Sequence, residues 1–184
     1  MNKKLAELYS RRVALFQQRI EKRILKDSIH FEAEYALSES PVAFTDRLRQ
    51  NYRKIGEGEM WGQAWQSAWF HLKSTIPAQW AGEHVVAQLE FTGEGLVFTA
   101  DGQPVQSVSG GAVFEPDYHR EIVRLFSPCQ GGEEVELWVE TAANSLFGVV
   151  QEVDPPRASP TRFGHFEAKV YKMRLCLFDQ ALWH

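Results

Sequence analysis

The sequence has few cysteines and none of the short motifs that mark common catalytic or redox sites. Its 184 residues include two cysteines, Cys129 and Cys176, and no CxxC pair for a zinc ribbon or a redox centre. We expect buried free thiols, because one bridge would be no disulfide framework. There is also no HExxH or HxH metal motif, no P-loop, no GxGxxG and no GxSxG. Enzymes that depend on those motifs are excluded for this segment.

Long apolar runs and a surplus of positive charge are also missing. No run approaches the roughly 18 apolar residues that a membrane span needs. The 20 basic and 24 acidic residues give a net charge of −4, which argues against nucleic acid as the main partner. Residues 1–23 lack the uninterrupted apolar region and small-residue cleavage site of a secretory signal. We therefore expect a cytoplasmic protein, with neither a membrane nor a nucleic acid as partner.

Residues 1–26 differ from the rest of the chain in charge and pattern. They carry eight basic and two acidic residues, a net of +6, which leaves −10 for residues 27–184. Their apolar residues recur at intervals of three to five, which predicts an amphipathic helix. These are Leu5, Leu8, Val13, Phe16, Ile20 and Ile24. We expect this face to cover part of the following domain or to join a second copy into a homo-oligomer. A membrane-surface helix, a nucleic-acid arm and a frayed terminus are the alternatives.

Residues 27–178 predict an antiparallel β-sandwich, since short runs of alternating apolar and polar residues recur between turns. The expected strands are 29–35, 69–76, 85–91, 96–100, 121–126, 135–141 and 171–177. In the last strand one side is expected to carry Tyr171, Met173, Leu175 and Leu177. Asp101-Gly102 predicts a hairpin turn. One short helix is expected at 44–55, capped by Thr45.

Three tryptophans lie at intervals of four residues. Trp61, Trp65 and Trp69 would share a helix face, but Gly62 and the β-rich run from Trp69 favour a turn that leads into a strand. Aromatic rings stack on sugar faces, so a carbohydrate site is one interpretation. Core packing is the favoured alternative, because aromatic side chains supply large contact areas.

Hydrolytic chemistry has no evident machinery in this segment. Glycoside hydrolysis needs two positioned carboxylates, whereas Glu133, Glu134 and Glu136 lie beside a turn or along one strand and indicate a solvated face. The six histidines are scattered. We predict no catalytic residue and no metal ligand here.

A set of short motifs follows in a characteristic order along the chain. They are Gly58, Trp61-Gly62, Trp65, Trp69-Phe70, Ile76-Pro77, Trp80-Ala81-Gly82, Glu94-Gly95-Leu96-Val97, Asp101-Gly102-Gln103-Pro104-Val105-Gln106, Gly110-Gly111, Glu136-Leu137-Trp138-Val139-Glu140, Ala143-Asn144-Ser145-Leu146-Phe147-Gly148 and Leu177-Phe178-Asp179-Gln180-Ala181-Leu182-Trp183. In this order they resemble the N-terminal region of the cytoplasmic or vacuolar-type α-mannosidases of glycoside hydrolase family 38. The resemblance covers nearly the whole chain and is most specific over residues 58–148.

The resemblance implies a large multidomain enzyme. Its N-terminal part would be a jelly-roll, galactose-binding-like sandwich preceded by helical segments. A catalytic domain would follow, with a zinc ion held by His and Asp and an aspartate nucleophile in a retaining mechanism. The family's zinc motif begins with His-x-Asp, which is absent here, so no catalytic or metal residue transfers to this chain. We expect no cofactor in this segment, and zinc in the catalytic domain.

Two departures from the family pattern concern positions near the expected turns. Thr92-Gly93 stands where the family often has Asn-Ser, and Ala143-Asn144-Ser145 where it often has Cys-Asn-Gly. They leave the expected fold unchanged.

The sequence therefore predicts three segments and a non-catalytic role. Residues 1–26 would be helical, 27–178 a β-sandwich, and 179–184 the start of a linker helix into the catalytic domain, with Asp179 as N-cap. We expect the domain to dock on the catalytic domain. A free-standing carbohydrate-binding module and a structural interaction domain are the alternatives. The candidates to lie near a mannose-containing glycan or an interface are Trp61, Trp65, Glu94 and Asn144.

Overall fold

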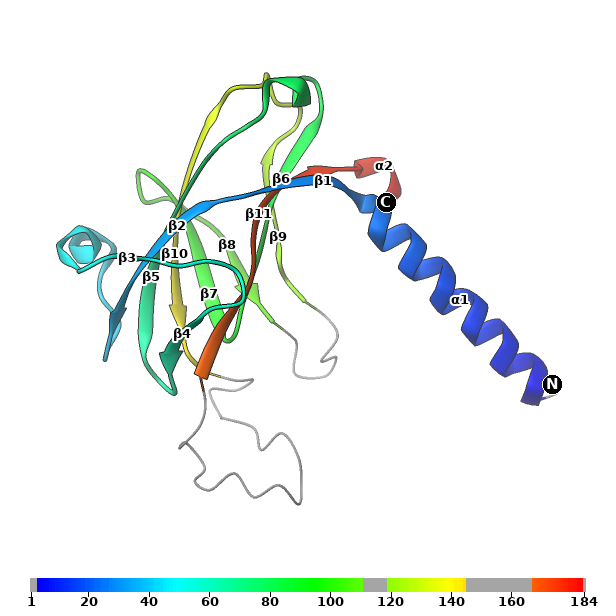
Figure 1. Ribbon diagram of the computed structural model, residues 1–184, viewed down its shortest axis with the longest axis horizontal. Coiled ribbons are helices and arrows are strands. Elements are labelled where there is room, and N and C mark those ends of the chain that lie inside the picture. The colour runs from blue at the N-terminus through cyan, green and yellow to red at the C-terminus, as the bar shows by residue number, and fades with distance from the viewer. Residues whose placement is uncertain (1–2, 111–118, 145–166, 184) are drawn as a thin grey trace, which may run out of the picture.

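Two antiparallel sheets pack face to face and form a β-sandwich (Figure 1). The computed structural model describes residues 3–110, 119–144 and 167–183. The five-stranded sheet has the order β1-β11-β6-β9, and β4 also pairs with β11. Its strands are β1 (Leu25–His30), β4 (Met60–Gln63), β6 (His84–Phe91), β9 (Ile122–Phe126) and β11 (Glu167–Phe178). The prediction of a mainly β, antiparallel sandwich is confirmed.

The six-stranded sheet has the order β3-β2-β5-β10-β7-β8. Its strands are β2 (Glu32–Ser38), β3 (Arg53–Lys54), β5 (Ser67–Thr75), β7 (Glu94–Thr99), β8 (Pro104–Ser109) and β10 (Glu134–Ala142). The remaining elements are the helices α1 (Lys3–Ile24) and α2 (Gln180–Trp183) and the 3-10 helices η1 (Phe44–Arg49) and η2 (Ala78–Trp80). Helix α1 passes into β1 at Leu25, so the sandwich begins there.

The core lies between the sheets and follows the period of two. Along β6 the inward residues are Val85, Ala87, Leu89 and Phe91, and all four are buried as predicted. In β11 the phase shifts, because the pairing with β6 skips from Val170 to Lys172 and leaves Tyr171 as an extra, bulged residue. Val170 therefore fills the core, and Tyr171 is exposed. The prediction that Tyr171 shares a side with Met173 is wrong for this reason.

The segment predicted as one strand at 29–35 is two strands that belong to different sheets. β1 pairs with β11 and β2 pairs with β5, and the chain crosses between the sheets at Phe31. The Phe31 ring is buried in the core, and the Phe31 backbone N–H donates to the Met173 carbonyl at 3.0 Å. One continuous stretch of chain therefore joins the two layers.

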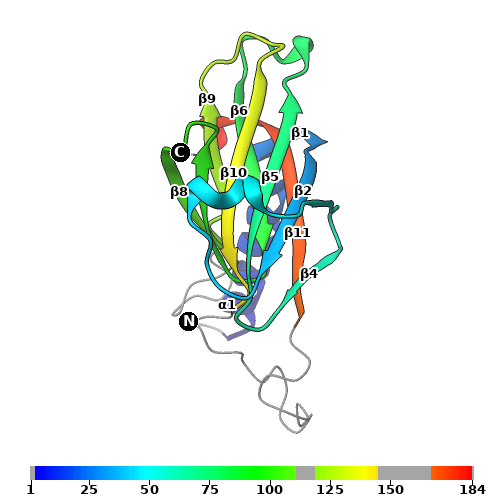
Figure 2. The ribbon, with the colours of Figure 1, turned by 90° about the vertical axis from the view of Figure 1, so that its left-hand side faces the viewer.

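In place of the predicted helix at 44–55, the structure has a six-residue 3-10 helix followed by the short strand β3. Ala43 occupies the N-cap position without a side-chain hydrogen bond, so the prediction of Thr45 as cap is wrong. Aromatic packing fixes the turn instead. The Phe44 ring lies 5.7 Å from Trp69 and 5.3 Å from Phe98. Figure 2 shows this segment crossing in front of the six-stranded sheet, whose outer face it covers.

The predicted hairpin at Asp101-Gly102 joins β7 to β8. Gly102 has φ +89°, and a Cβ there would meet the Phe44 ring at 2.6 Å, so both conformation and space require glycine. At the far edge, Ser109 pairs with Arg120, and the Gln106 side chain donates to the Ile122 carbonyl. These contacts link the edges of the two sheets.

Helix α1 extends away from the sandwich (Figure 1). Its anchor is its last turn, where the Asp179 N–H donates to the Ile24 carbonyl at 2.7 Å and Ile24 packs against the cluster around Phe178. Leu8, Val13 and Phe16 are 45%, 57% and 64% exposed. The expectation that the apolar face covers the sandwich is therefore wrong for the part of the chain that the structure describes. The periodicity predicted the helix correctly, and contact of its apolar face with a second copy stays a prediction.

Candidate functional site

The structure separates the four residues that sequence analysis singled out. Trp61 is 2% exposed, and its ring meets Phe70 edge-on at 5.5 Å in the core. Its ring thus faces the interior. Trp65, by contrast, is 53% exposed on the turn between β4 and β5. The predicted turn leading into a strand is thereby confirmed.

Trp65 occupies a strained backbone position. Its φ is +72°, which is unusual for a bulky residue. Hydrogen bonds enforce the turn: the Trp65 N–H donates to the Ala143 carbonyl, and the Gln63 N–H donates to Gln66 Oε1, both at 2.8 Å. The strained residue thus carries an exposed ring.

Glu94 and Asn144 lie at the same end of the six-stranded sheet as Trp65. Glu94 pairs with Ala142 across β7 and β10, and the Asn144 N–H donates back to the Ala142 carbonyl. Asn144 Oδ1 is buried without a hydrogen-bond partner among the described residues. The fold thus brings together three of the four candidates, and Trp61 stays in the core.

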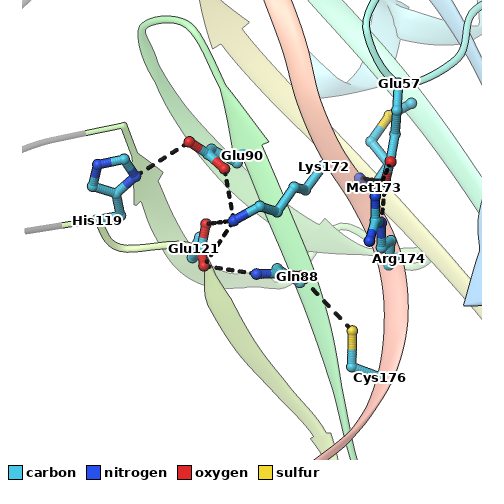
Figure 3. Close-up of polar contacts among 9 residues, drawn as sticks. All are labelled: Glu57, Gln88, Glu90, His119, Glu121, Lys172, Met173, Arg174 and Cys176. Carbon is cyan, nitrogen blue, oxygen red and sulfur yellow. Dashed lines mark hydrogen bonds and ion pairs between the residues drawn. The ribbon is translucent and has the colours of Figure 1, made fainter. Parts of the chain in front are cut away.

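Sequence analysis missed a polar cluster on the outer face of the five-stranded sheet (Figure 3). At its centre the Lys172 ammonium lies 3.0 Å from Glu90 Oε2 and 3.2 Å from Glu121 Oε2. His119 Nδ1 lies 3.2 Å from Glu90 Oε1, and Gln88 donates to Glu121 at 2.7 Å. We call Glu90, His119, Glu121 and Lys172 the lysine cluster.

Burial and charge act in opposite directions on Lys172. Desolvation by burial lowers the pKa of its amine, but the hydrogen bond to Glu90 and the charges of Glu121 and Glu90 raise that pKa overall. The ammonium form is therefore stabilised, and it forms ion pairs with two carboxylates at once.

A second ion pair lies beside the lysine cluster on β11. Arg174 Nε donates to Glu57 Oε1 at 2.7 Å, and the Met173 N–H donates to the same oxygen at 2.8 Å. Burial alone would raise the pKa of Glu57, but the bonds from Arg174 and Met173 lower it overall. The pair fixes the Glu57 loop to the sheet.

Both cysteines are buried free thiols, as predicted. Burial raises the pKa of Cys176 to about 12, so its thiolate is scarce at neutral pH. The outer face therefore offers no reactive nucleophile at this position.

The lysine cluster contains three metal-ligating side chains. Ligand atoms of Glu90, His119 and Glu121 lie within 4.8 Å of one another. The Lys172 ammonium, however, already binds both carboxylates. The zinc that the resemblance implies belongs to a His-x-Asp motif this sequence lacks, and these residues do not fit it.

A cavity of about 390 Å³ opens next to the lysine cluster. Its lining residues are Gln106, His119, Arg120, Glu121, Ile122 and Trp183. Trp183, on α2, is 50% exposed. Asp179 caps this helix as predicted, because Asp179 Oδ1 accepts the Leu182 N–H at 3.1 Å. An indole and several hydrogen-bonding side chains thus share one hollow.

This fold defines the protein first as a β-sandwich of the jelly-roll class. Within that class, residues 28–177 match the family described as "Alpha-mannosidase, jelly roll domain", and the chain belongs to that family. The resemblance noted from the sequence is thereby confirmed.

Two relatives agree with this assignment, and a solved structure shares the fold. The chain is 29% identical to α-mannosidase 2C1 of Mus musculus over 126 residues, which are 68% of this chain and 12% of the mouse protein. It is 30% identical to the Homo sapiens protein over 112 residues, which are 61% of this chain and 10% of the human one. A Ruminococcus gnavus β-glucuronidase in complex with D-glucuronic acid aligns with a TM-score of 0.50 over 84% of this chain and 29% of its own. At 8% identity, that likeness shows the fold alone.

Proposed function

We propose that this chain is the non-catalytic jelly-roll domain of an α-mannosidase and that it docks on the enzyme's catalytic domain. The observation that carries the proposal is the family match over residues 28–177. The chain spans about a tenth of the curated relatives' length, which leaves room for a separate catalytic domain. Hydrolysis of α-mannosides is thus the activity of the whole enzyme.

The geometry of the described acidic residues supports a non-catalytic role. Glu90 and Glu121 are close together, but the Lys172 ammonium fills the space between them. Glycosidases keep that space for the scissile bond, with one carboxyl free to donate a proton. This pair instead stabilises the fold.

The test has two arms. The 184-residue chain should release nothing above blank from an aryl α-mannoside, with or without added zinc. An antibody raised against the chain should precipitate α-mannosidase activity from the source cells on a polypeptide several times longer. Turnover by the purified chain, or precipitation of a short inactive polypeptide, would contradict the proposal.

The exposed face of α1 supports a second proposal, that α1 joins two copies of the chain. Residues 1–26 carry +6 and the remainder −10, so the helix of one copy is attracted to the sandwich of another. Burial of Leu8, Val13 and Phe16 would add roughly 1.5–3 kcal/mol for each side chain before entropy is subtracted.

A matched pair of variants tests this oligomer. Phe16→Glu places a charge on the apolar face, and Gln18→Glu places the same charge on the opposite side of the helix. We expect sedimentation to show dissociation for the first variant alone. Equal sedimentation of both variants and of the unaltered chain would reject α1 as the contact.

The cellular location is a further part of the proposal. Both cysteines are free, which fits a reducing compartment. No helix among the described residues is long and apolar enough to cross a bilayer. We place the protein in the cytoplasm. Fractionation of the source cells, with the antibody as probe, checks this.

A further inference from the structure

The cavity beside the lysine cluster has walls from three parts of the fold. Gln106 comes from β8, His119 to Ile122 lead into and begin β9, and Trp183 ends α2. Its volume of about 390 Å³ lies within the range of small-ligand pockets. The contact between β8 and β9 therefore leaves a cavity beside the edge at which the two sheets meet.

Hydrogen bonds hold the polar side chains of this cavity in place. Gln106 Nε2 donates to the Ile122 carbonyl at 2.9 Å, and Arg120 Nη1 donates to Ser107 Oγ at 2.9 Å. Glu121 accepts from both Lys172 and Gln88 (Figure 3). A ligand would meet donors and acceptors that need little ordering, which lowers the entropic cost of binding.

Charge decides which class of ligand fits. A divalent cation would compete with the Lys172 ammonium, which is within 3.2 Å of both carboxylates. An anion would gain from Arg120 but would lie beside Glu121. The two carboxylates are balanced by Lys172 and Arg120, so the hollow suits a neutral molecule rich in hydrogen-bonding groups.

Trp183 supplies the apolar part of the site. Its ring lines the cavity and contacts the Phe178 ring in a tilted arrangement, with the centroids 5.7 Å apart. A half-exposed indole offers a flat surface to the C–H face of a ring. An indole platform beside fixed carboxylate, guanidinium and amide groups matches the two-sided chemistry of a sugar, which is apolar on its faces and polar at its rim.

We propose that this cavity binds a neutral saccharide of one or two rings, with Trp183 as the stacking platform and Glu121, Arg120 and Gln106 as hydrogen-bonding partners. The inference goes beyond the proposed function, since a docking domain needs no sugar site. It also moves the sugar site from the end of the six-stranded sheet, where Trp65, Glu94 and Asn144 lie, to the edge of the five-stranded sheet.

The experiment follows the indole N–H signals of the 184-residue chain by two-dimensional NMR. The probes are methyl α-mannopyranoside and α-mannobiose, added well above a Kd on the order of 1 mM. We expect one indole signal to move, and we expect the same signal to be the one that Trp183→Ala removes. Binding should weaken at least tenfold in Trp183→Ala, and Arg120→Ala should weaken it as well.

Trp65→Ala is the matched control, since Trp65 and Trp183 are similarly exposed. It should change the affinity less than twofold. Circular dichroism confirms that each variant is folded. Loss of binding in Trp65→Ala alone, unchanged binding in Trp183→Ala, or no shift with either sugar overturns the inference. The inference is also overturned if zinc or calcium chloride moves the His119 signals and neither sugar moves any signal.

The proposed function fails in a different way. The antibody arm measures α-mannosidase activity on a longer polypeptide and does not depend on Trp183. A chain that precipitates this activity but binds no sugar would overturn the saccharide site alone.

Discussion

On each outer face of the sandwich, one basic side chain lies between two carboxylates, but the two side chains differ. On the five-stranded sheet, Lys172 lies between Glu90 and Glu121. On the six-stranded sheet, the His71 ring nitrogens lie 3.0 Å from Glu34 and 2.8 Å from Glu136. In each case a basic side chain on one strand contacts two acids from other segments of the sheet.

The two arrangements differ in how much of their bonding capacity they use. An ammonium has three N–H donors, whereas an imidazole has two at most, and both His71 nitrogens already face carboxylates. His71 also stacks on Trp138, with centroids 3.8 Å apart, and Arg47 from η1 lies over that indole. Both sites border a cavity: His71 and Glu34 line one of about 480 Å³, and the lysine cluster lies beside the one of about 390 Å³. The difference is that the cavity beside the lysine cluster also contains an indole, that of Trp183.

Replacement of the lysine should have the largest effect. Lys172→Met leaves two carboxylates together without a cation, so we expect a loss of about 2–3 kcal/mol of unfolding free energy, the lower end for broken ion pairs because Lys172 is partly exposed. Urea denaturation measures it. Lys169→Met, on the same strand but without a carboxylate partner among the described residues, should cost much less. Equal losses would show that the cluster contributes no specific stability.

Replacement of the histidine should cost less. His71→Gln keeps one donor but loses the stack on Trp138, so we expect a loss of about 1–2 kcal/mol. His84→Gln is the control, since that exposed ring bonds only to Ser127 Oγ among the described contacts. A loss larger than that of Lys172→Met would reverse the comparison, with the histidine site as the more stabilising one.

The pH dependence of the neighbouring Glu57–Arg174 pair should show the smallest effect. The pKa of Glu57 is lowered in the folded state, so its contribution is present above the ordinary carboxyl pKa of about 4.3 and is lost as the pH falls through the lowered value. We expect Glu57→Gln to cost about 1–2 kcal/mol at pH 7. Thermal unfolding between pH 7 and pH 3 should show the variant and the unaltered chain converging. A difference in stability that stays constant with pH would show that the loss comes from packing and not from the Glu57 charge.

The regular part of the fold was predictable because it obeys a simple period. The alternation from Val85 to Phe91 identified a strand and its inward face correctly, since both depend on local sequence alone. The prediction failed at Tyr171 and Phe31. There a bulge and a crossing between the sheets shift the alternation of inward and outward residues without a signal in the local sequence. In both cases the partner strand decides the outcome.

The candidate site was hidden for a related reason. Glu90, Glu121 and Lys172 are scattered in sequence, and the adjacent positions of β11, β6 and β9 bring them together. The one hint of this site in the sequence is a charged residue at an outward position of a largely apolar strand, as at Glu90. Only the register of the paired strands shows that Glu90 lies next to Lys172, and neither composition nor residue spacing provides that register.

The crossing at Phe31 ties the movements of α1 to both layers. A pull on the helix acts first on β1, an edge strand, and then on the Phe31 amide, which is bonded to Met173 in the five-stranded sheet and is followed directly by β2 in the other. We therefore expect amide hydrogen exchange to be fast along α1 and slow at the buried Phe31, whose N–H is bonded to the Met173 carbonyl. The crossing at Phe31 should thereby keep fraying of the helix from spreading into the core.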